Sequence, residues 1–534
     1  MSAALAGARV LTRIALRRDR VVLPASVAAI AGMVIVTAAS FASLYPTVRE
    51  RVAFAGDVNA NAGLRALYGP VFDPTTIGGL TAWRMGVFGA IGAALLSLLL
   101  VVRHTRAEEE SGRLELIGAG AVARPAPLAA ALATVAAADL ALALLTALGL
   151  LLVGEPLAGS LALGLAFALT GWVFAAVAAV AAQVTASARL ANGIACAVLG
   201  AAFLLRAAGD AAGDDGPGWL TWCSPLGWAE QVRPYAGDRW AVLLAPLAAT
   251  ALLTAAAFAL GGRRDLGGAL VGERPGPPRA SARLGSAMAL AIRLQRGALI
   301  GWGTGLALAG AAFCGLADSV ASLFDDNADL TELFQRLGGV SGVVDAYLSS
   351  MAGLIAIVAA AYATQAVLRL RHEEAAGRAE PLLAAPVTRL RWALGHLLFA
   401  FAGSALLLLA AGLCGGVAYG LAAGDLGGQL GRVTAAMAAQ APAAWVVAGL
   451  AVALVGLLPR RATLSWAALV AFVLLGQIGP LLELPRWALD CSPFTHAPKL
   501  PGGDADPVAL LGLTAVAAAL TAAGLAGLRR RDVG

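Results

Sequence analysis

The chain has 534 residues, of which 60% are hydrophobic and only 13% are charged, and its mean hydropathy is +0.80. Because soluble domains carry about 25% charged residues, this composition excludes a soluble enzyme and predicts an all-α polytopic membrane protein in a lipid bilayer. The formal net charge of +6 is then a matter of membrane topology, and no nucleic-acid partner is expected.

Residues 1–20 are expected to form an amphipathic helix on the inner membrane surface. Arginines recur there every three or four positions with apolar residues between them: Arg9, Arg13, Arg17, Arg20 and Val10, Leu11, Ile14, Leu16. The apolar run that follows is longer than the 7–15 residues typical of a signal peptide, so it is taken as the first span. The alternative for residues 1–20 is a frayed basic tail.

Twelve apolar runs are long enough to cross a bilayer, which takes about 20 residues of helix. The first half, 21–261, holds six predicted spans at 21–44, 82–102, 127–153, 157–182, 190–206 and 240–260. A proline-containing linker at 262–281 and a second amphipathic connecting helix at 282–297 lead into the second half, 298–534. Its six predicted spans are 298–316, 347–368, 393–419, 433–458, 462–482 and 508–528.

The loops on one side of these spans, together with both termini, hold most of the basic residues. By the positive-inside rule this side is cytoplasmic, so both termini are expected inside the cell. The two halves also repeat one another: 108–115 aligns with 373–380, Arg124 with Arg389, Trp172 with Trp445, and Cys223-Ser224-Pro225 with Cys491-Ser492-Pro493. Six is an even number of spans, so the halves are parallel and their pseudo-twofold axis runs along the membrane normal.

The repeated cytoplasmic loops follow the second span of each half and predict short helices that project from the membrane. Glu109 with Arg113, and Glu374 with Arg378, have the i,i+4 spacing that favours helical ion pairs. Gly112 and Gly377 would lie inside these helices, at a cost of up to about 1 kcal/mol relative to Ala, which predicts close approach by another surface. The alternative is solvated turns that repeat only because the gene was duplicated.

The chain contains one lysine, Lys499, and it is followed by Leu500. A P-loop requires Gly-Lys-Ser or Gly-Lys-Thr, in which the lysine contacts the phosphates. The sequence therefore holds no ATP site of this kind, and if ATP drives the protein another chain must bind it. The cysteines and histidines have no zinc-site spacing, so no metal is expected.

The pattern E-E-x-x-G-R-x-E-x(8)-R, present twice in a twelve-span chain, resembles the fused two-half permeases of ATP-binding cassette (ABC) exporters, above all the actinobacterial polyketide-antibiotic or tetronasin-type multidrug exporters. The resemblance implies a type V exporter-like fold in a bacterial plasma membrane. It implies no cofactor in this chain, two copies of a separate ATPase subunit that binds ATP and Mg, and export of hydrophobic or amphipathic drug-like compounds such as polyketides or lipids.

The resemblance also assigns sites. Residues 103–126 and 368–392 correspond to coupling helices that dock the ATPases, with these contact residues: Glu108, Glu109, Gly112, Arg113, Glu115, Glu373, Glu374, Gly377, Arg378 and Glu380. Segments 208–239 and 483–507, each with Cys-Ser-Pro, correspond to re-entrant outer loops. Pro381 stands where the first loop has Leu116, which predicts a shorter second helix.

Asp139 is the one acid predicted deep within a span, where a charge costs at least about 2.5–3.5 kcal/mol. Its counterpart in the second half is Ser404. These two residues, with Trp172 and Trp445, are candidates to line the substrate pathway; the alternatives are a hydrogen bond to a neighbouring helix and ordinary aromatic packing. Cys223 and Cys491 lie on the outer side, where a disulfide between the halves could persist; free thiols are the alternative.

Two other functions are weighed against the exporter. A proton-coupled secondary transporter also has two six-span halves, but it predicts several buried ionisable residues where the sequence offers Asp139. A non-transporting sensor partner of an ATPase predicts a large soluble domain, which the sequence does not show.

Overall fold

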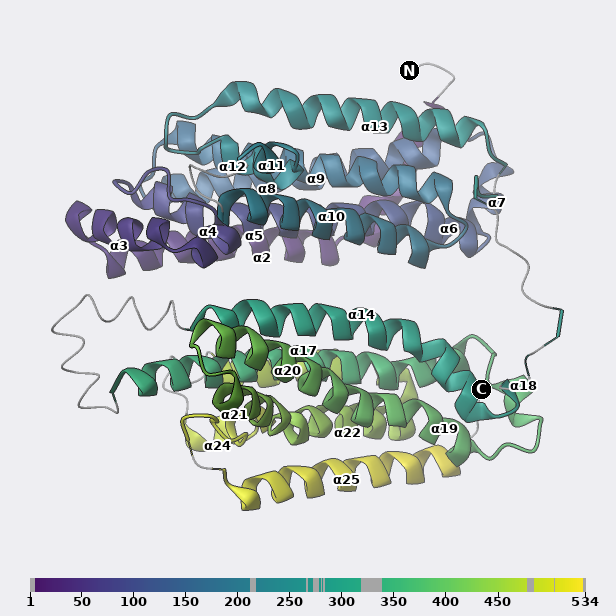
Figure 1. Ribbon diagram of the computed structural model, residues 1–534. Helices are drawn as coiled ribbons and strands as arrows, with labels where there is room; N and C mark the ends of the chain where they lie inside the picture. Colours follow the sequence, from purple (N-terminus) through teal and green to yellow (C-terminus); the bar gives the residue numbers. More distant parts are fainter. Residues whose placement is uncertain are drawn as a thin grey trace. The chain divides into compact units, whose positions relative to one another are not determined.

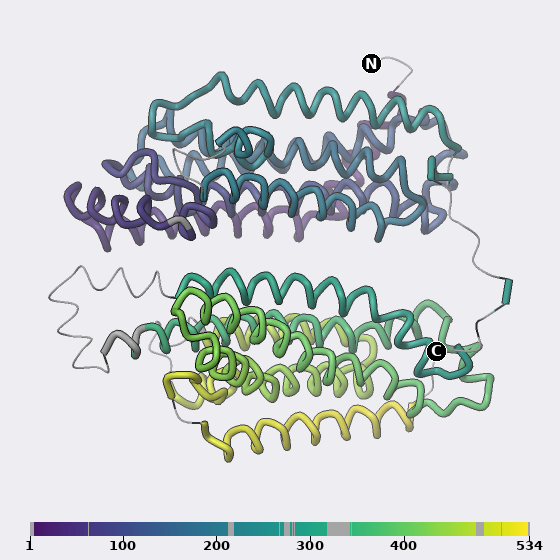
Figure 2. The backbone as a smooth tube through the Cα atoms, in the orientation of Figure 1, coloured from purple at the N-terminus to yellow at the C-terminus, as the bar shows by residue number. Residues whose placement is uncertain are grey.

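The computed structural model describes residues 5–211, 218–265, 268–271, 278, 279, 281, 284–317, 339–477, 485–503 and 505–531. The chain divides into two compact units, Met1–Gly276 (unit 1) and Pro277–Gly534 (unit 2), and each is a helical bundle (Figures 1 and 2). Among the described residues, eleven helices are long and apolar enough to cross a membrane, and there is no strand. The protein is therefore an all-α polytopic membrane protein, as its composition predicts.

Unit 1 follows the predicted order of spans. Its helices are α1 (Ala8–Arg18), α2 (Val22–Leu44), α3 (Val48–Ala60), α4 (Ala62–Tyr68), α5 (Ile77–His104), α6 (Arg106–Glu110), α7 (Arg113–Gly118), α8 (Ala126–Leu152), α9 (Leu157–Val184), α10 (Ala188–Ala211), α11 (Trp219–Trp222), α12 (Pro225–Gln231) and α13 (Leu244–Gly262), the last preceded by the 3₁₀ segment η2 (Trp240–Leu243). Helix α9 is the centre of the bundle, and α5, α8, α10 and α13 all pack against it. Its buried face is rich in alanine and glycine, which let helices approach closely within a membrane.

Between its first two spans unit 1 has two helices, α3 and α4, that the sequence analysis does not predict. A reciprocal capping box starts α3, because the Thr47 hydroxyl accepts from the Glu50 amide and the Glu50 carboxylate accepts from the Thr47 amide. The Thr-x-x-Glu spacing is the sequence signal for such a start. The two helices cover an aromatic cluster in which the Trp83 ring packs on both Phe54 and Tyr68.

The helices of unit 2 are interrupted more often than those of unit 1, by a π segment and by 3₁₀ segments. Its helices are α14 (Ala287–Gly315), α17 (Gly339–Ala375), α18 (Glu380–Leu383), α19 (Arg389–Leu398), the π segment η4 (Phe399–Gly403), α20 (Ser404–Ala422), α21 (Leu426–Ala438), α22 (Ala441–Leu457), η5 (Pro459–Arg461), α23 (Leu464–Gln477), α24 (Arg486–Leu489), η6 (Pro493–Thr495) and α25 (Pro507–Arg530). The predicted span at 433–458 is divided between α21 and α22, and Pro442 lies in the first turn of α22, where proline is tolerated. Residues 478–482 of the predicted span at 462–482, and most of the linker at 262–281, lie outside the described residues.

The structure differs from the expectation of a separate connecting helix at 282–297. From Ala287 onward these residues are the first turns of α14, which continues into the membrane span. Gly297 alone does not interrupt it. In unit 1, by contrast, α1 ends at Arg18 and the next residue, Asp19, is fully buried between Arg103 (3.0 Å) and His104 (2.5 Å) of α5. The buried Asp19 therefore lies at the break between α1 and α2. Residues 282–297 contain no aspartate or glutamate that could make the same contacts.

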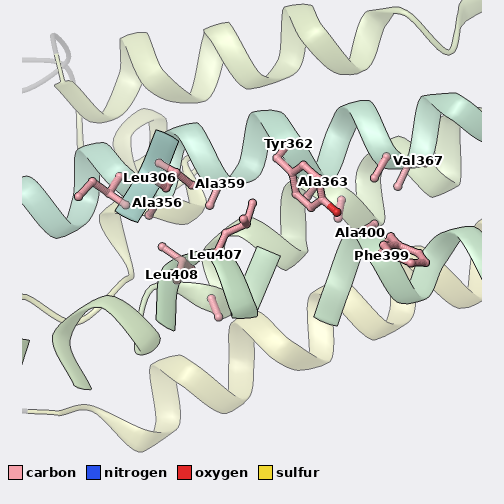
Figure 3. Close-up of a cluster of buried hydrophobic side chains, with 14 of the residues drawn as sticks. Leu306, Ala356, Ala359, Tyr362, Ala363, Val367, Phe399, Ala400, Leu407 and Leu408 are labelled. Atoms are coloured by element: carbon pink, nitrogen blue, oxygen red, sulfur yellow. The ribbon is translucent and has the colours of Figure 1, made fainter. Parts of the chain in front are cut away.

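The core of unit 2 surrounds the π segment (Figure 3). A Cβ on Gly403 would lie 2.6 Å from the Tyr362 hydroxyl oxygen, so only glycine lets α17 lie this close. A π segment leaves a carbonyl without its usual helical partner, and here the Trp445 indole N–H donates to the Phe401 carbonyl oxygen (3.0 Å).

Candidate functional site

Each repeated loop contains two short helical pieces with a glycine between them. In unit 1 these are α6 and α7, and Gly112 has φ +71°; in unit 2 the end of α17 and α18 flank Gly377, with φ +69°. The prediction that the glycines lie inside helices is therefore wrong. A left-handed backbone ends a helix and favours glycine, and a Cβ at either position would meet no atom of the chain within 4 Å.

This change of direction also shifts the ion pairs by one residue. Arg113 pairs with Glu108 (3.5 Å) and Arg378 with Glu373 (2.7 Å). The predicted i,i+4 partners, Glu109 and Glu374, point instead into their own units. The i,i+4 rule requires an unbroken helix, and the left-handed glycine breaks it in both loops.

In unit 1, Glu109 binds the arginine that follows the last helix. Arg264 donates to both of its carboxylate oxygens, from Nη2 to Oε1 (2.6 Å) and from Nη1 to Oε2 (2.8 Å), and both side chains are only 8% exposed. Arg106 of α6 also pairs with Glu109. The loop after the second span is thereby fixed to the end of α13.

Unit 2 has the same arrangement. Glu374 is fully buried and binds Arg531, which follows α25, with 2.7 Å between Arg531 Nη2 and Glu374 Oε2, and it also pairs with Arg371 (3.3 Å). We call the pairs Glu109–Arg264 and Glu374–Arg531 the inner clamps. The spacing of residues within the loops does not predict these pairs; the sequence signal for them is the repeated Arg-Arg-Asp that begins at Arg263 and at Arg530.

Several other residues of each loop are open to solvent. In unit 1 the exposed side of α7 carries Glu115 and Leu116, and Leu116 is 80% exposed. In unit 2, Arg378 and Glu380 are exposed. Helix α18 has four residues and α7 has six, so the second helix is shorter, as the proline predicts; Pro381 lies in its first turn.

The pathway candidates lie within the units, between packed helices. Asp139 is fully buried in α8 and accepts hydrogen bonds from the Ser97 hydroxyl of α5 at Oδ2 (2.8 Å) and Oδ1 (3.0 Å). A Cβ on Gly171 of α9 would lie 2.5 Å from Asp139 Oδ2, so three helices meet at this carboxyl group. Ser404 is also fully buried and donates to the Ala400 carbonyl of the preceding π segment (2.7 Å).

The two tryptophans pack against apolar and aromatic side chains of their own units. Trp172 follows Gly171 and packs partly buried against an apolar cluster that includes Ala162 and Val232. Trp445 packs against Phe401 with ring centroids 6.5 Å apart. A role for Asp139, Ser404, Trp172 and Trp445 in a substrate pathway stays a prediction.

The serine in each Cys-Ser-Pro motif ties its segment to the preceding span. The Ser224 hydroxyl donates to the Ala202 carbonyl of α10 (2.7 Å) and accepts from the Leu226 amide at the start of α12 (3.2 Å). The Ser492 hydroxyl donates to the Phe472 carbonyl of α23 (2.9 Å). Cys223 and Cys491 are exposed free thiols, and a disulfide between them stays a prediction.

A buried charge network at this same end of unit 1 was not predicted. Arg206 is fully buried; its Nη1 donates to Asp210 Oδ2 (3.0 Å) and to Glu230 Oε2 (3.3 Å), and its Nη2 donates to the Leu67 carbonyl (3.1 Å). Burial raises the pKa of Glu230 well above its usual value. The i,i+4 spacing of Arg206 and Asp210 at the end of a span was the available signal. Among the described residues no cluster of His, Cys, Asp and Glu could hold a metal ion.

Comparison with known proteins gives two consistent results. Residues 284–529 match the family model described as the C-terminal domain of the multidrug efflux system permease Rv1217c. Over 524 residues the chain is 44% identical to the multidrug efflux system permease protein Rv1217c of Mycobacterium tuberculosis (strain ATCC 25618 / H37Rv), and the match covers 98% of this chain and 94% of that protein.

Proposed function

The chain belongs to the family of the multidrug efflux system permease Rv1217c, and on this premise we propose that it is the permease subunit of an ABC exporter. Separate ATPase subunits bind ATP and Mg, and the permease moves hydrophobic or amphipathic drug-like compounds out of a bacterial cell. The excess of basic residues in the loops on one side of the spans supports a cytoplasmic position for both termini, the inner clamps and the helices α7 and α18.

The observation that carries this proposal is the repeated construction of the two loops. In each unit a short helix lies just beyond the second span, exposes charged or apolar side chains, and is fixed by a buried glutamate to the end of the last helix. A force applied to α7 or α18 is therefore passed to two spans at once. Twin levers of this kind suit two identical ATPases that move together and apart.

The sequence also supports a permease that relies on a separate subunit to bind ATP. The chain has no P-loop lysine, and Lys499 is its one lysine, so ATP binding belongs to a partner. ATP binding would draw the two ATPases together and the levers would follow. The two halves would then rock between inward-open and outward-open states, and hydrolysis would reset the cycle.

Fewer residues of the repeated motif can contact a partner than the sequence predicts. Glu109, Glu373 and Glu374 are engaged in ion pairs inside their units, so they position the loops rather than face a partner. Exposed Glu115 and Leu116 in the first loop and Glu380 in the second remain for contact with the ATPases, together with the exposed part of Arg378, which also pairs with Glu373.

Capture of the full-length chain from its own membranes tests the proposal. The wild-type chain is expected to bring down Mg-dependent ATPase activity. Leu116→Asp combined with Glu380→Lys should remove most of that activity while leaving the amount of captured permease unchanged. Val52→Asp is the matched control, because Val52 is an exposed apolar residue of α3. No ATPase activity with the wild-type chain, or full activity with the double variant, would contradict the proposal.

A further inference from the structure

Unit 1 contains a large cavity at the end that carries α7. Its volume is about 720 Å³, and its walls come from α8 (Leu128, Ala129, Leu132), α13 (Thr254, Phe258) and the end of α9 (Gln183). Helices α8 and α13 both pack on α9, and the cavity occupies the space left between them. Figure 1 shows α13 along one edge of unit 1.

The second half shows why this space exists. In unit 2 the backbones of α22 and α25 touch: a Cβ on Gly456 would lie 1.9 Å from the Gly524 carbonyl oxygen, and one on Gly524 would lie 2.4 Å from the Val452 carbonyl oxygen. Alignment of Trp172 with Trp445 puts Gln183 at the position of Gly456.

Alignment of the inner-clamp arginines, Arg264 with Arg531, in turn puts Ala257 at the position of Gly524 and Leu260 at that of Gly527. Larger side chains therefore hold α13 away from α9 at the place where glycines let α25 close on α22. The cavity is a consequence of this difference in sequence between the two halves.

The cavity has the depth and polarity of a lipid site. From Thr254 to Gly262 it follows nine residues of α13, a rise of about 12 Å at 1.5 Å per residue, which is most of the roughly 15 Å of hydrocarbon in one leaflet. Most of its walls are apolar, and Gln183, Thr254 and the Glu109–Arg264 clamp add polar groups to the lining. Its mouth carries two exposed charges, Arg124 and Asp265, and neither side chain has a hydrogen-bond or ion-pair partner among the described residues.

We propose that this cavity binds one phospholipid of the adjoining leaflet, with an acyl chain between α8 and α13 and the phosphate at Arg124. A guanidinium group at the membrane surface binds phosphate through paired charge-assisted hydrogen bonds. Asp265 at the same mouth suits the ammonium of a zwitterionic headgroup, which favours phosphatidylethanolamine over phosphatidylglycerol. The volume lies within the roughly 300–1,000 Å³ of ordinary ligand sites. This site does not depend on which compound the chain transports.

Native mass spectrometry of the full-length chain tests the proposal, after reconstitution with phosphatidylethanolamine and phosphatidylglycerol in equal amounts. One retained phospholipid per chain is expected, mostly phosphatidylethanolamine. Ala129→Phe fills the cavity and should abolish retention; Arg124→Gln should reduce it about tenfold or more, the loss expected for one hydrogen bond to a charged group.

The controls carry the same chemical changes elsewhere. Ala133 lies one turn further along α8 than Ala129, is exposed and does not line the cavity, so Ala133→Phe should retain the lipid. Arg13→Gln removes an exposed charge from α1 and should retain it as well. If Ala129→Phe does not fold, Arg124→Gln against Arg13→Gln decides. Retention that is equal in Arg124→Gln and wild type, or a wild-type chain without retained lipid, would overturn the proposal. A retained lipid without headgroup preference would overturn the assignment to Asp265.

Discussion

The inner clamp of unit 1 gives the sharpest prediction, which is the effect of Glu109→Gln. The carboxylate of Glu109 receives two hydrogen bonds from Arg264 and pairs with Arg106 as well. Both members of the clamp are 8% exposed. The substitution removes the carboxylate that pairs with the nearly buried guanidinium groups of Arg106 and Arg264. Their remaining acceptors among the described residues are uncharged oxygens, such as Gln183 Oε1, which lies 2.7 Å from Arg264 Nε.

Loss of one partner of a buried ion pair costs about 3–5 kcal/mol. The lower end, about 3 kcal/mol, is expected here because a glutamine oxygen still accepts one hydrogen bond and Arg264 keeps its bond to Gln183. At about 2–4 °C per kcal/mol for a domain of this size, the midpoint of thermal unfolding should fall by about 6–12 °C. The transition can be followed by tryptophan fluorescence of the purified chain in detergent.

A double-mutant cycle separates the clamp from general damage. Glu109→Gln, Arg264→Gln and the double variant should show a coupling energy of about 1–3 kcal/mol. Glu115→Gln is the matched control, because Glu115 is exposed and should shift the midpoint by less than about 1 °C. Equal shifts for Glu109→Gln and Glu115→Gln, or zero coupling, would refute the reasoning.

Three further predictions concern other parts of the structure. Because burial raises the pKa of Glu230 above its usual 4.5, the folded chain keeps a proton that the unfolded chain releases, so stability should fall as the pH rises from 4.5 toward the raised pKa; Glu230→Gln should remove this slope in unfolding midpoints measured from pH 5 to 8. Gly456→Val should force α22 from α25 and cost about 3 kcal/mol or more, seen as a lower unfolding midpoint. Gly512→Ala, where a Cβ meets no atom within 4 Å, should instead raise stability by up to about 1 kcal/mol, because alanine favours the helix more than glycine does. Ser224→Ala should cost about 1–2 kcal/mol through the lost helix cap, and Cys223→Ala in the same assay should cost nothing measurable.

Hydropathy predicted eleven of the twelve spans as long apolar helices among the described residues, because it reflects the cost of exposed polar groups in lipid. The count of twelve stays a prediction, since the run at 462–482 is described only as the shorter helix α23. The helix observed for the first predicted span, Val22–Leu44, begins one residue later than predicted, and Leu157–Val184 extends two residues further. The helices α3 and α4 were missed because they lie outside the apolar runs, and a capping box is a weaker signal than hydropathy.

The loop chemistry could be predicted only in part. The repeat located both loops, and Pro381 predicted the shorter second helix. The ion-pair register was wrong, since it depends on the positive φ of Gly112 and Gly377, and spacing rules assume a continuous helix. The inner clamps join residues about 155 positions apart, and no local pattern encodes such a contact.

The measurement that tests the central claim most directly is photo-crosslinking in the native membrane. A benzoylphenylalanine at position 116 on α7, and another at position 380 on α18, should each form a covalent adduct with the same P-loop ATPase. The same probe at position 52 on α3 should form none. An adduct with that ATPase from position 52, or none from positions 116 and 380, would contradict a permease that is driven from the exposed helices of its two repeated loops.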